Sequence, residues 1–183
     1  HWEAMAKGAA MSGIIQTVGE NVCGMDPEAT YTNGKVTNSP DMASRVRAFR
    51  ELWDGKHGGI AVQTNVEDQR GGVDEYALSK LEVDIIERKW GQGAKAIGGE
   101  VRLTTLERAL EMKRRGYLVL PDPEDRAVQE EFRAGAFKSF ERHSRVGFPE
   151  HRSFVEDVEE LRSKGARYVF LKTGAYRPEV VAF

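Results

Sequence analysis

The sequence predicts an α/β fold built on a parallel β-sheet, which is a (β/α) barrel or part of one. Short apolar runs typical of buried strands alternate along the chain with segments of helical periodicity. No tight two-residue hairpin turn is apparent between any pair of strands, which favours βα units. No Gly-x-Gly-x-x-Gly motif follows a strand, which disfavours a dinucleotide-binding half.

The first half of the chain predicts helices and strands in alternation. An alanine-rich helix is expected at Met5–Met11, a strand at Gly13–Val18, and then a long polar loop. Ser39 as N-cap and Pro40 at the first helical position mark the next helix. The apolar stripe of that helix is expected to comprise Met42, Val46, Phe49 and Trp53. Strands are then predicted at 59–64 and 82–87, with a short helix at 73–81 between them.

The second half continues the same pattern. Thr104–Glu107 reads as a capping box that opens a helix ending at Gly116, and a strand is expected at 117–120. Residues 124–140 look helical. Ser153–Glu156 reads as a second capping box, and the last strand is expected at 167–172.

Composition excludes several classes of protein. The 183 residues include 27 Lys and Arg against 29 Asp and Glu, a net charge of −2, so no nucleic-acid partner is expected. The short basic run that includes Lys113 and Arg115 is explained by the last turn of a helix. Cys23 is the single cysteine, so the chain has no internal disulfide and no set of cysteines for a metal or cluster. No run approaches the length of a membrane span, no signal peptide is visible, and a cytoplasmic protein is the default expectation.

Charged and polar residues follow several predicted strands. Glu20 comes just after the strand at 13–18, Gln92 and Lys95 come after the strand at 82–87, and Lys172 ends the last strand. Ligands of α/β proteins bind at the carboxyl ends of the strands, and lysines there suit an anionic or electron-rich ligand. Lys172 is expected to be poorly hydrated because it ends an apolar strand. The alternative is that each is an isolated surface residue.

Four segments resemble the flavin-binding domain of glutamate synthases. VDIIERKWGQGAKAIGGE (83–100) is similar to the family's IEIKxxQGAKPGxGG segment, and TVGENVCGMDPE (17–28) resembles its NTGEGG loop. YLVLPDPED (117–125) stands where the family has LISPPPHHD. RYVFLKTGAYRPEVVAF (167–183) is similar to its VSVKLVSE…GVGTIAAGVA strand, loop and helix. The order and spacing agree over nearly the whole chain, and the similarity includes stand-alone flavin subunits such as that of N-methylglutamate synthase.

The resemblance implies a portion of a parallel (β/α)8 TIM barrel that binds FMN. Such an enzyme reduces 2-iminoglutarate, formed from 2-oxoglutarate and ammonia, to glutamate. Residues 1–183 would form part of one such barrel domain, without its first strand and its C-terminal half. The chain begins within a helical pattern and stops at an apolar helix opening, so we expect a fragment that is inactive alone.

The resemblance also implies roles for individual residues. Lys172 matches the strand-end lysine that contacts the flavin ring, and Gln92 lies in the loop that lines the cofactor. Lys95 matches the lysine that holds the 2-oxoacid carboxylate, and Glu20 matches a loop glutamate near the substrate; both are candidate catalytic residues. Arg114 is matched to a second carboxylate-binding arginine.

Departures from the family pattern bear on substrate and cofactors. Glu100 stands where the family has a substrate-contacting glutamine, and a carboxylate there would repel a dicarboxylate. The departure leaves open whether the substrate is 2-oxoglutarate or a similar 2-oxoacid. The glycine-rich phosphate loops and the cysteines of the iron–sulfur cluster are absent from the chain. Ammonia would come from a glutaminase subunit and electrons from a separate donor, within an oligomer.

Two other interpretations remain open. The chain is alternatively a non-catalytic fragment or assembly module that binds no flavin by itself, which the missing phosphate loops favour. A third interpretation is another flavin-barrel oxidoreductase or isomerase that shares only the residues at the strand ends.

Overall fold

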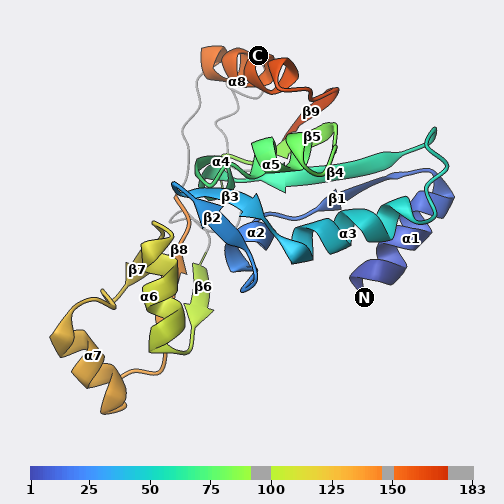
Figure 1. The fold of residues 1–183 in the computed structure, drawn as a ribbon. Helices are drawn as coiled ribbons and strands as arrows, with labels where there is room; N and C mark the ends of the chain where they lie inside the picture. The colour runs from blue at the N-terminus through green and yellow to red at the C-terminus, as the bar shows by residue number, and fades with distance from the viewer. Residues whose placement is uncertain (92–99, 146–150, 173–183) are drawn as a thin grey trace. The chain divides into compact units, whose positions relative to one another are not determined.

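The computed structural model describes residues 1–91, 100–145 and 151–172. The chain divides into two compact units, of which the first comprises His1–Gly91 with Gly147–Phe183 and the second comprises Gln92–Val146. The second unit is therefore inserted in the sequence between the two parts of the first (Figure 1).

The first unit contains a parallel sheet of four strands. The strand order is β1-β4-β5-β9, and the strands span Ile15–Val18, Gly59–Thr64, Ile85–Arg88 and Tyr168–Leu171. All three pairings are parallel, with Val62 of β4 in register with Val18 of β1 and with Ile86 of β5. These four strands confirm the parallel α/β prediction, and the described residues form no closed barrel.

Helices cover one face of this sheet. The helices that contribute to the core on this face are α1 (Trp2–Ser12), α2 (Val22–Met25), α3 (Pro40–Arg50), α5 (Val73–Ser79) and α8 (His151–Ser163), and α4 (Val66–Arg70) follows the end of β4. Helices α1 and α3 lie side by side (Figure 1). Side chains alternate along a strand, so Val18, Val62 and Ile86 share a face, and all three belong to one buried core with Phe49 of α3.

The start of α3 confirms the sequence prediction. Ser39 is the N-cap and its Oγ accepts from the Met42 amide at 3.4 Å, with Pro40 at the first helical position. Met42, Val46 and Phe49 are buried as expected. The helix ends at Arg50, so Trp53 lies beyond it and packs partly buried against the core.

The opposite face of the sheet exposes apolar side chains on its edge strands. Ile15 of β1 is 46% exposed, and Tyr168 and Phe170 of β9 are 48% and 40% exposed. Gln63 of β4 and Glu87 of β5 are in register and share this face. The two faces therefore differ, because among the residues that the structure describes the helices of the unit cover only one of them.

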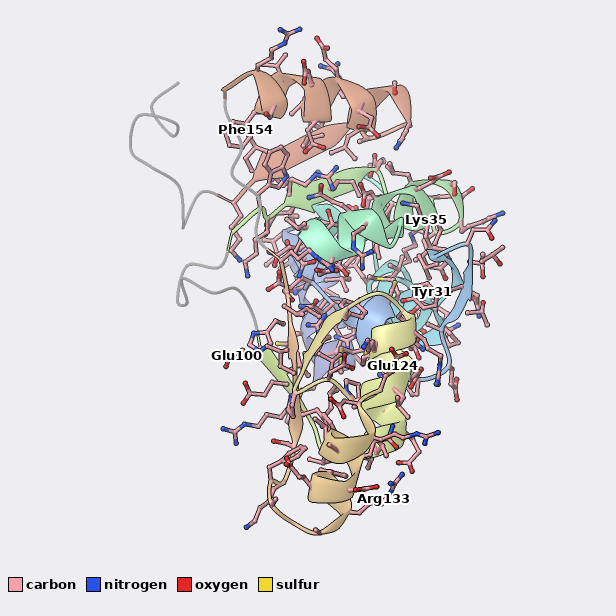
Figure 2. All side chains as sticks on the ribbon, turned by 90° about the vertical axis from the view of Figure 1, so that its left-hand side faces the viewer. Tyr31, Lys35, Glu100, Glu124, Arg133 and Phe154 are labelled. Carbon is pink, nitrogen blue, oxygen red and sulfur yellow. The ribbon has the colours of Figure 1, made fainter. Side chains whose placement is uncertain are left out.

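An antiparallel hairpin interrupts the parallel pattern. Strands β2 (Thr30–Thr32) and β3 (Lys35–Asn38) are joined by Asn33 and Gly34, whose φ angles are 51° and 74°. An Asn-Gly pair with positive φ at both positions is a two-residue hairpin turn. The expectation that the chain has no such turn is therefore wrong. Tyr31 and Lys35 lie on this hairpin (Figure 2). The Tyr31 hydroxyl donates to the Cys23 carbonyl, and the Lys35 ammonium donates to a backbone carbonyl of α4, so both side chains attach the hairpin to the rest of the unit.

The second unit contains an antiparallel sheet. Its strands lie in the order β6-β8-β7 and span Glu100–Leu103, Phe140–His143 and Leu118–Leu120, with helices α6 (Leu106–Arg114) and α7 (Arg126–Arg133). The expected strand at 117–120 is present as β7, but the prediction that it belongs to a parallel sheet is wrong, because it pairs antiparallel with β8. The expected helix over 124–140 ends at Arg133, and residues 140–143 form a strand instead.

Two predicted helix starts are displaced. Thr105, and not Thr104, caps α6, because its hydroxyl accepts from the Arg108 amide at 3.2 Å. Ser153 lies inside α8, which begins at His151. In both places the local pattern is correct to within about a turn, but the sequence alone does not select which hydroxyl is the cap.

Among the helices that the structure describes, none combines the length and the apolar character that crossing a bilayer requires.

Candidate functional site

The carboxyl ends of the parallel strands form the candidate site. Parallel strands place these ends along one edge of the sheet, where α/β proteins bind ligands. The first residues beyond the strands include polar and charged side chains from all four strands, namely Glu20, Asn65, Lys89 and Lys172.

Glu20 and Lys89 form an ion pair across this edge. The Lys89 ammonium donates to Glu20 Oε1 at 2.6 Å, and the two side chains are only 14% and 19% exposed. β4 lies between the strands that precede them, so the pair bridges strand ends that are not neighbours. Sequence reasoning missed Lys89, although it directly follows β5.

Polar side chains fix the backbone that carries Glu20. Asn21 has a positive φ of 66°, and its amide donates to Asp68 Oδ2 at 2.9 Å. Asn65 closes a capping box with Asp68 at the start of α4, and its side-chain amide donates to Asn21 Oδ1 at 3.1 Å. The segment after β1 is therefore held to the segment after β4, which defines the position of Glu20.

Lys172 lies at the end of β9 on the less covered face of the sheet. Its amide donates to the Arg88 carbonyl at 2.9 Å, which continues the β5–β9 pairing. Its ammonium lies 3.8 Å from Glu87 Oε1, and Gln63 donates a hydrogen bond to the same oxygen. The Lys172 side chain is 51% exposed, so the expectation that it is poorly hydrated is wrong.

Arg88 has a structural role on the face of the sheet that the helices cover. Its guanidinium is 3% exposed and binds Asp157 of α8 through Nε at 2.6 Å and Nη2 at 2.8 Å. Its Nη1 donates to Asp74 of α5 at 2.9 Å and to Thr64 at 2.8 Å. Burial disfavours the charged form, but the hydrogen bonds and charges of Asp157 and Asp74 outweigh it and raise the pKa of Arg88.

The remaining predicted site residues lie elsewhere or outside the description. Gln92 and Lys95 lie outside the described residues. Glu100 is the first residue of β6 and belongs to the second unit (Figure 2). Arg114 is exposed in the last turn of α6, also in the second unit. Of the predicted residues, Glu20 and Lys172 therefore share an edge of one sheet, and each has its own oppositely charged neighbour.

The basic residues beside Arg114 form ion pairs within the second unit. Lys113 lies in the last turn of α6 and pairs with Asp122 at 2.5 Å, and Arg115 pairs with Glu111 at 2.6 Å. The interpretation of this run as the cationic end of a helix is confirmed.

Cys23 does not fit a metal or cluster ligand. The side chain is fully buried in the core, and burial raises the pKa of its thiol from 9.0 to about 12. A thiol that stays protonated in an apolar core is a packing residue.

One cavity of about 330 Å³ lies at the other end of the sheet. Its lining includes Gly13 before β1 and His57 before β4, so it is at the amino ends of these strands. It therefore does not coincide with the edge that carries Glu20 and Lys89.

Comparisons of the chain with family models, with curated proteins and with solved structures found no match.

Proposed function

We propose that the protein is part of an FMN-dependent oxidoreductase of glutamate synthase type, which reductively aminates 2-oxoglutarate or a similar 2-oxoacid. The observation that carries this proposal is the placement of Glu20, Lys89 and Lys172 along one carboxyl edge of a parallel sheet. The sequence resemblance supplies the chemistry, because it assigns a substrate role to Glu20 and a flavin role to Lys172.

We further propose that the four-stranded sheet is a portion of a (β/α)8 barrel. Parallel sheets are normally covered on both faces, and barrels cover the inner face by closing the sheet on itself. The exposed Ile15, Tyr168 and Phe170 on the face opposite the helices support this proposal. Gln63 and Glu87 would then point into the barrel interior.

Lys172 fits a flavin in charge and in position. FMN accepts and donates a hydride, and its reduced ring carries negative charge that a nearby ammonium stabilises. The Lys172 ammonium is half exposed at the strand end, so it is accessible to a ligand while its charge is only partly offset by Glu87. Gln92 would contribute to the same cofactor site, as the resemblance suggests.

Glu20 and Lys89 fit a 2-oxoacid and its iminium form. An ammonium such as Lys89 can bind the oxoacid carboxylate, and a carboxylate such as Glu20 favours the positive charge of the iminium carbon–nitrogen bond. Condensation of the 2-oxoacid with ammonia releases water, and addition of a hydride to the iminium yields the amino acid. The resemblance gives Lys95, Glu100 and Arg114 of the second unit substrate roles of their own. Ammonia would come from a glutaminase subunit and electrons from a separate donor.

Flavin titration of the full-length protein tests this proposal. FMN should bind, and Lys172→Met should lower the two-electron midpoint potential, because the ammonium no longer stabilises the reduced ring. At about 4 Å in a well-hydrated setting the interaction is about 1 kcal/mol, which corresponds to about 20 mV. Lys164 is the matched control, since it is 40% exposed and paired with Glu160 on α8.

Three outcomes decide between the interpretations. A shift in Lys172→Met that is absent from Lys164→Met supports the proposed role. Equal potentials in all three proteins would remove the flavin role of Lys172. A full-length protein that binds no flavin would contradict the enzyme and leave the non-catalytic assembly module.

A further inference from the structure

Three metal-ligating side chains gather on one face of the antiparallel sheet in the second unit. Glu100 of β6 is the register partner of His143 of β8, and Glu141 lies two residues before His143 on the same strand. Residues two apart on a strand share a face, and so do direct partners on neighbouring strands. The strand pairing alone therefore brings the three side chains together, and no loop is needed to position them.

The distances suit a single small cation. One ligand atom from each of Glu100, Glu141 and His143 lies within 4.8 Å of the other two. His143 Nε2 is 3.7 Å from Glu141 Oε2, and the two side chains are 14% and 42% exposed. The three residues are intermediate in burial and lie on two directly paired strands.

We propose that Glu100, Glu141 and His143 form a binding site for a divalent transition-metal ion of the Zn²⁺ class. An imidazole with two carboxylates suits Zn²⁺ and its first-row neighbours, whereas Mg²⁺ and Ca²⁺ prefer oxygen ligands alone. Two carboxylates offset the charge of the cation. Three protein ligands leave a fourth position for water or a substrate atom, which is the arrangement of catalytic zinc sites.

Neighbouring cations define the site further. Arg102 is the register partner of Glu141 and lies on the same face of the sheet. Arg142 has its side chain on the other face, where it is buried and stacks 4.5 Å from the centre of the Tyr117 ring. The positive charge of Arg102 on this face should disfavour a bound cation, so its removal should tighten binding.

This inference does not depend on the proposed flavin chemistry, and it gives Glu100 a metal-binding role in place of the substrate role that the resemblance implies. The three ligands lie entirely within Gln92–Val146, whereas Glu20, Lys89 and Lys172 lie in the other unit. A negative flavin titration would leave the metal site untouched, and the absence of metal binding would leave the flavin proposal untouched.

The experiment measures Zn²⁺ binding to the full chain after chelator treatment, with Co²⁺ absorption as a spectroscopic report of the ligand geometry. One Zn²⁺ should bind per chain. His143→Ala and Glu100→Gln should each weaken binding at least about tenfold, the lower bound for disturbing a metal's supporting residues. Arg102→Gln should tighten it. His57→Ala is the matched control, because His57 pairs with Asp54 in the first unit and should not contribute.

Several results would overturn the proposal. They are an absence of Zn²⁺ binding, equal binding by the wild type and His143→Ala, or loss of binding in His57→Ala. Circular dichroism verifies that each variant is folded. If His143→Ala is not folded, Glu141→Gln replaces it, because Glu141 is the more exposed residue. Glu141→Gln should also weaken Zn²⁺ binding at least about tenfold, and an unchanged affinity would contradict the site.

Discussion

Lys89 and Glu20 join two strand ends that are not neighbours, because β4 separates β1 from β5 and the 2.6 Å ion pair spans the gap. The carboxyl edge of the sheet is therefore held together by side chains as well as by the backbone ladder. The five predictions that follow concern this edge, Arg88 on the helix-covered face of the sheet, two glycines and the buried Cys23.

The Glu20–Lys89 pair should contribute measurably to stability. Both side chains are largely buried and the hydrogen bond is charge-assisted, so a double-mutant cycle with Glu20→Gln and Lys89→Met should give a coupling of about 1 kcal/mol or more. Arg152 and Glu156 are the control pair, since they are 89% and 61% exposed and should couple by less than about 0.5 kcal/mol. Denaturant unfolding measures both cycles, and equal coupling energies would contradict the assignment.

Replacing Arg88 should destabilise the first unit strongly. Arg88→Met leaves Asp157 and Asp74 buried without their cation, and breaking such a network typically costs about 3–5 kcal/mol. Arg88→Lys should recover only part of this, because lysine cannot bind Asp157 through two parallel hydrogen bonds.

The matched control for Arg88 is Arg152→Met on the surface of α8, which should change the free energy of unfolding by no more than about 0.5 kcal/mol. Thermal or denaturant unfolding gives all three values. A loss of less than about 1 kcal/mol in Arg88→Met would mean that Asp157 and Asp74 find other partners.

Two glycine substitutions should act with opposite signs. Gly34 has φ of 74° in the hairpin turn, so Gly34→Ala should lower the free energy of unfolding by about 1 kcal/mol. Gly8 lies inside α1 and a Cβ there would meet nothing within 4 Å, so Gly8→Ala should raise it by about 0.5–1 kcal/mol. Both changes add the same methyl group, and an equal effect on unfolding would rule out the positive-φ explanation.

Cys23 should be unreactive in the folded protein. Burial raises the pKa of the thiol to about 12 from 9.0, so at pH 8 about one folded molecule in ten thousand carries the thiolate. A disulfide reagent should modify it only as fast as the unit opens, and rapidly once denaturant is added. Rapid modification of the native protein would show that the side chain is accessible.

The same shift predicts a loss of stability in base. A folded-state pKa above the unfolded one means that the thiol contributes stability below about pH 9, which is lost as the pH rises toward 12. The unfolding free energy of the wild type should therefore fall more steeply with pH than that of Cys23→Ala. Comparing the two proteins between pH 8 and 10.5 isolates the thiol from the lysines and tyrosines that titrate in the same range.

The parallel strands were predictable because they are apolar and short. Runs such as Gly59–Thr64 are buried throughout, and burial on both sides of the backbone leaves a continuous hydrophobic signal. Strands β6 and β8 give no such signal, because alternate residues such as Glu100, Glu141 and His143 face away from the core. The antiparallel unit was missed for this reason.

The hairpin had a signal that was overlooked. Asn33 and Gly34 stand between residues of strand propensity, which is a strong local pattern for a two-residue turn. The surrounding segment is polar, so it was interpreted as loop. At the candidate site, Glu20 and Lys172 were located by their position at the ends of strands, and the same rule applied directly after β5 would have found Lys89. Its pairing with Glu20 depends on the strand order, which the sequence does not specify.

The insertion of the second unit has a consequence for the order in which the protein can fold as it is synthesised. β1, β4 and β5 can pair once residues up to Gly91 are available, but β9 and Asp157 follow only after the whole inserted unit. Until then Arg88 has Asp74 and Thr64 but lacks its bidentate partner, and β5 remains an edge strand. An unpaired edge and an incompletely paired buried cation make the nascent intermediate prone to wrong pairing. Rapid folding of the inserted unit would shorten the time for which the first unit stays open.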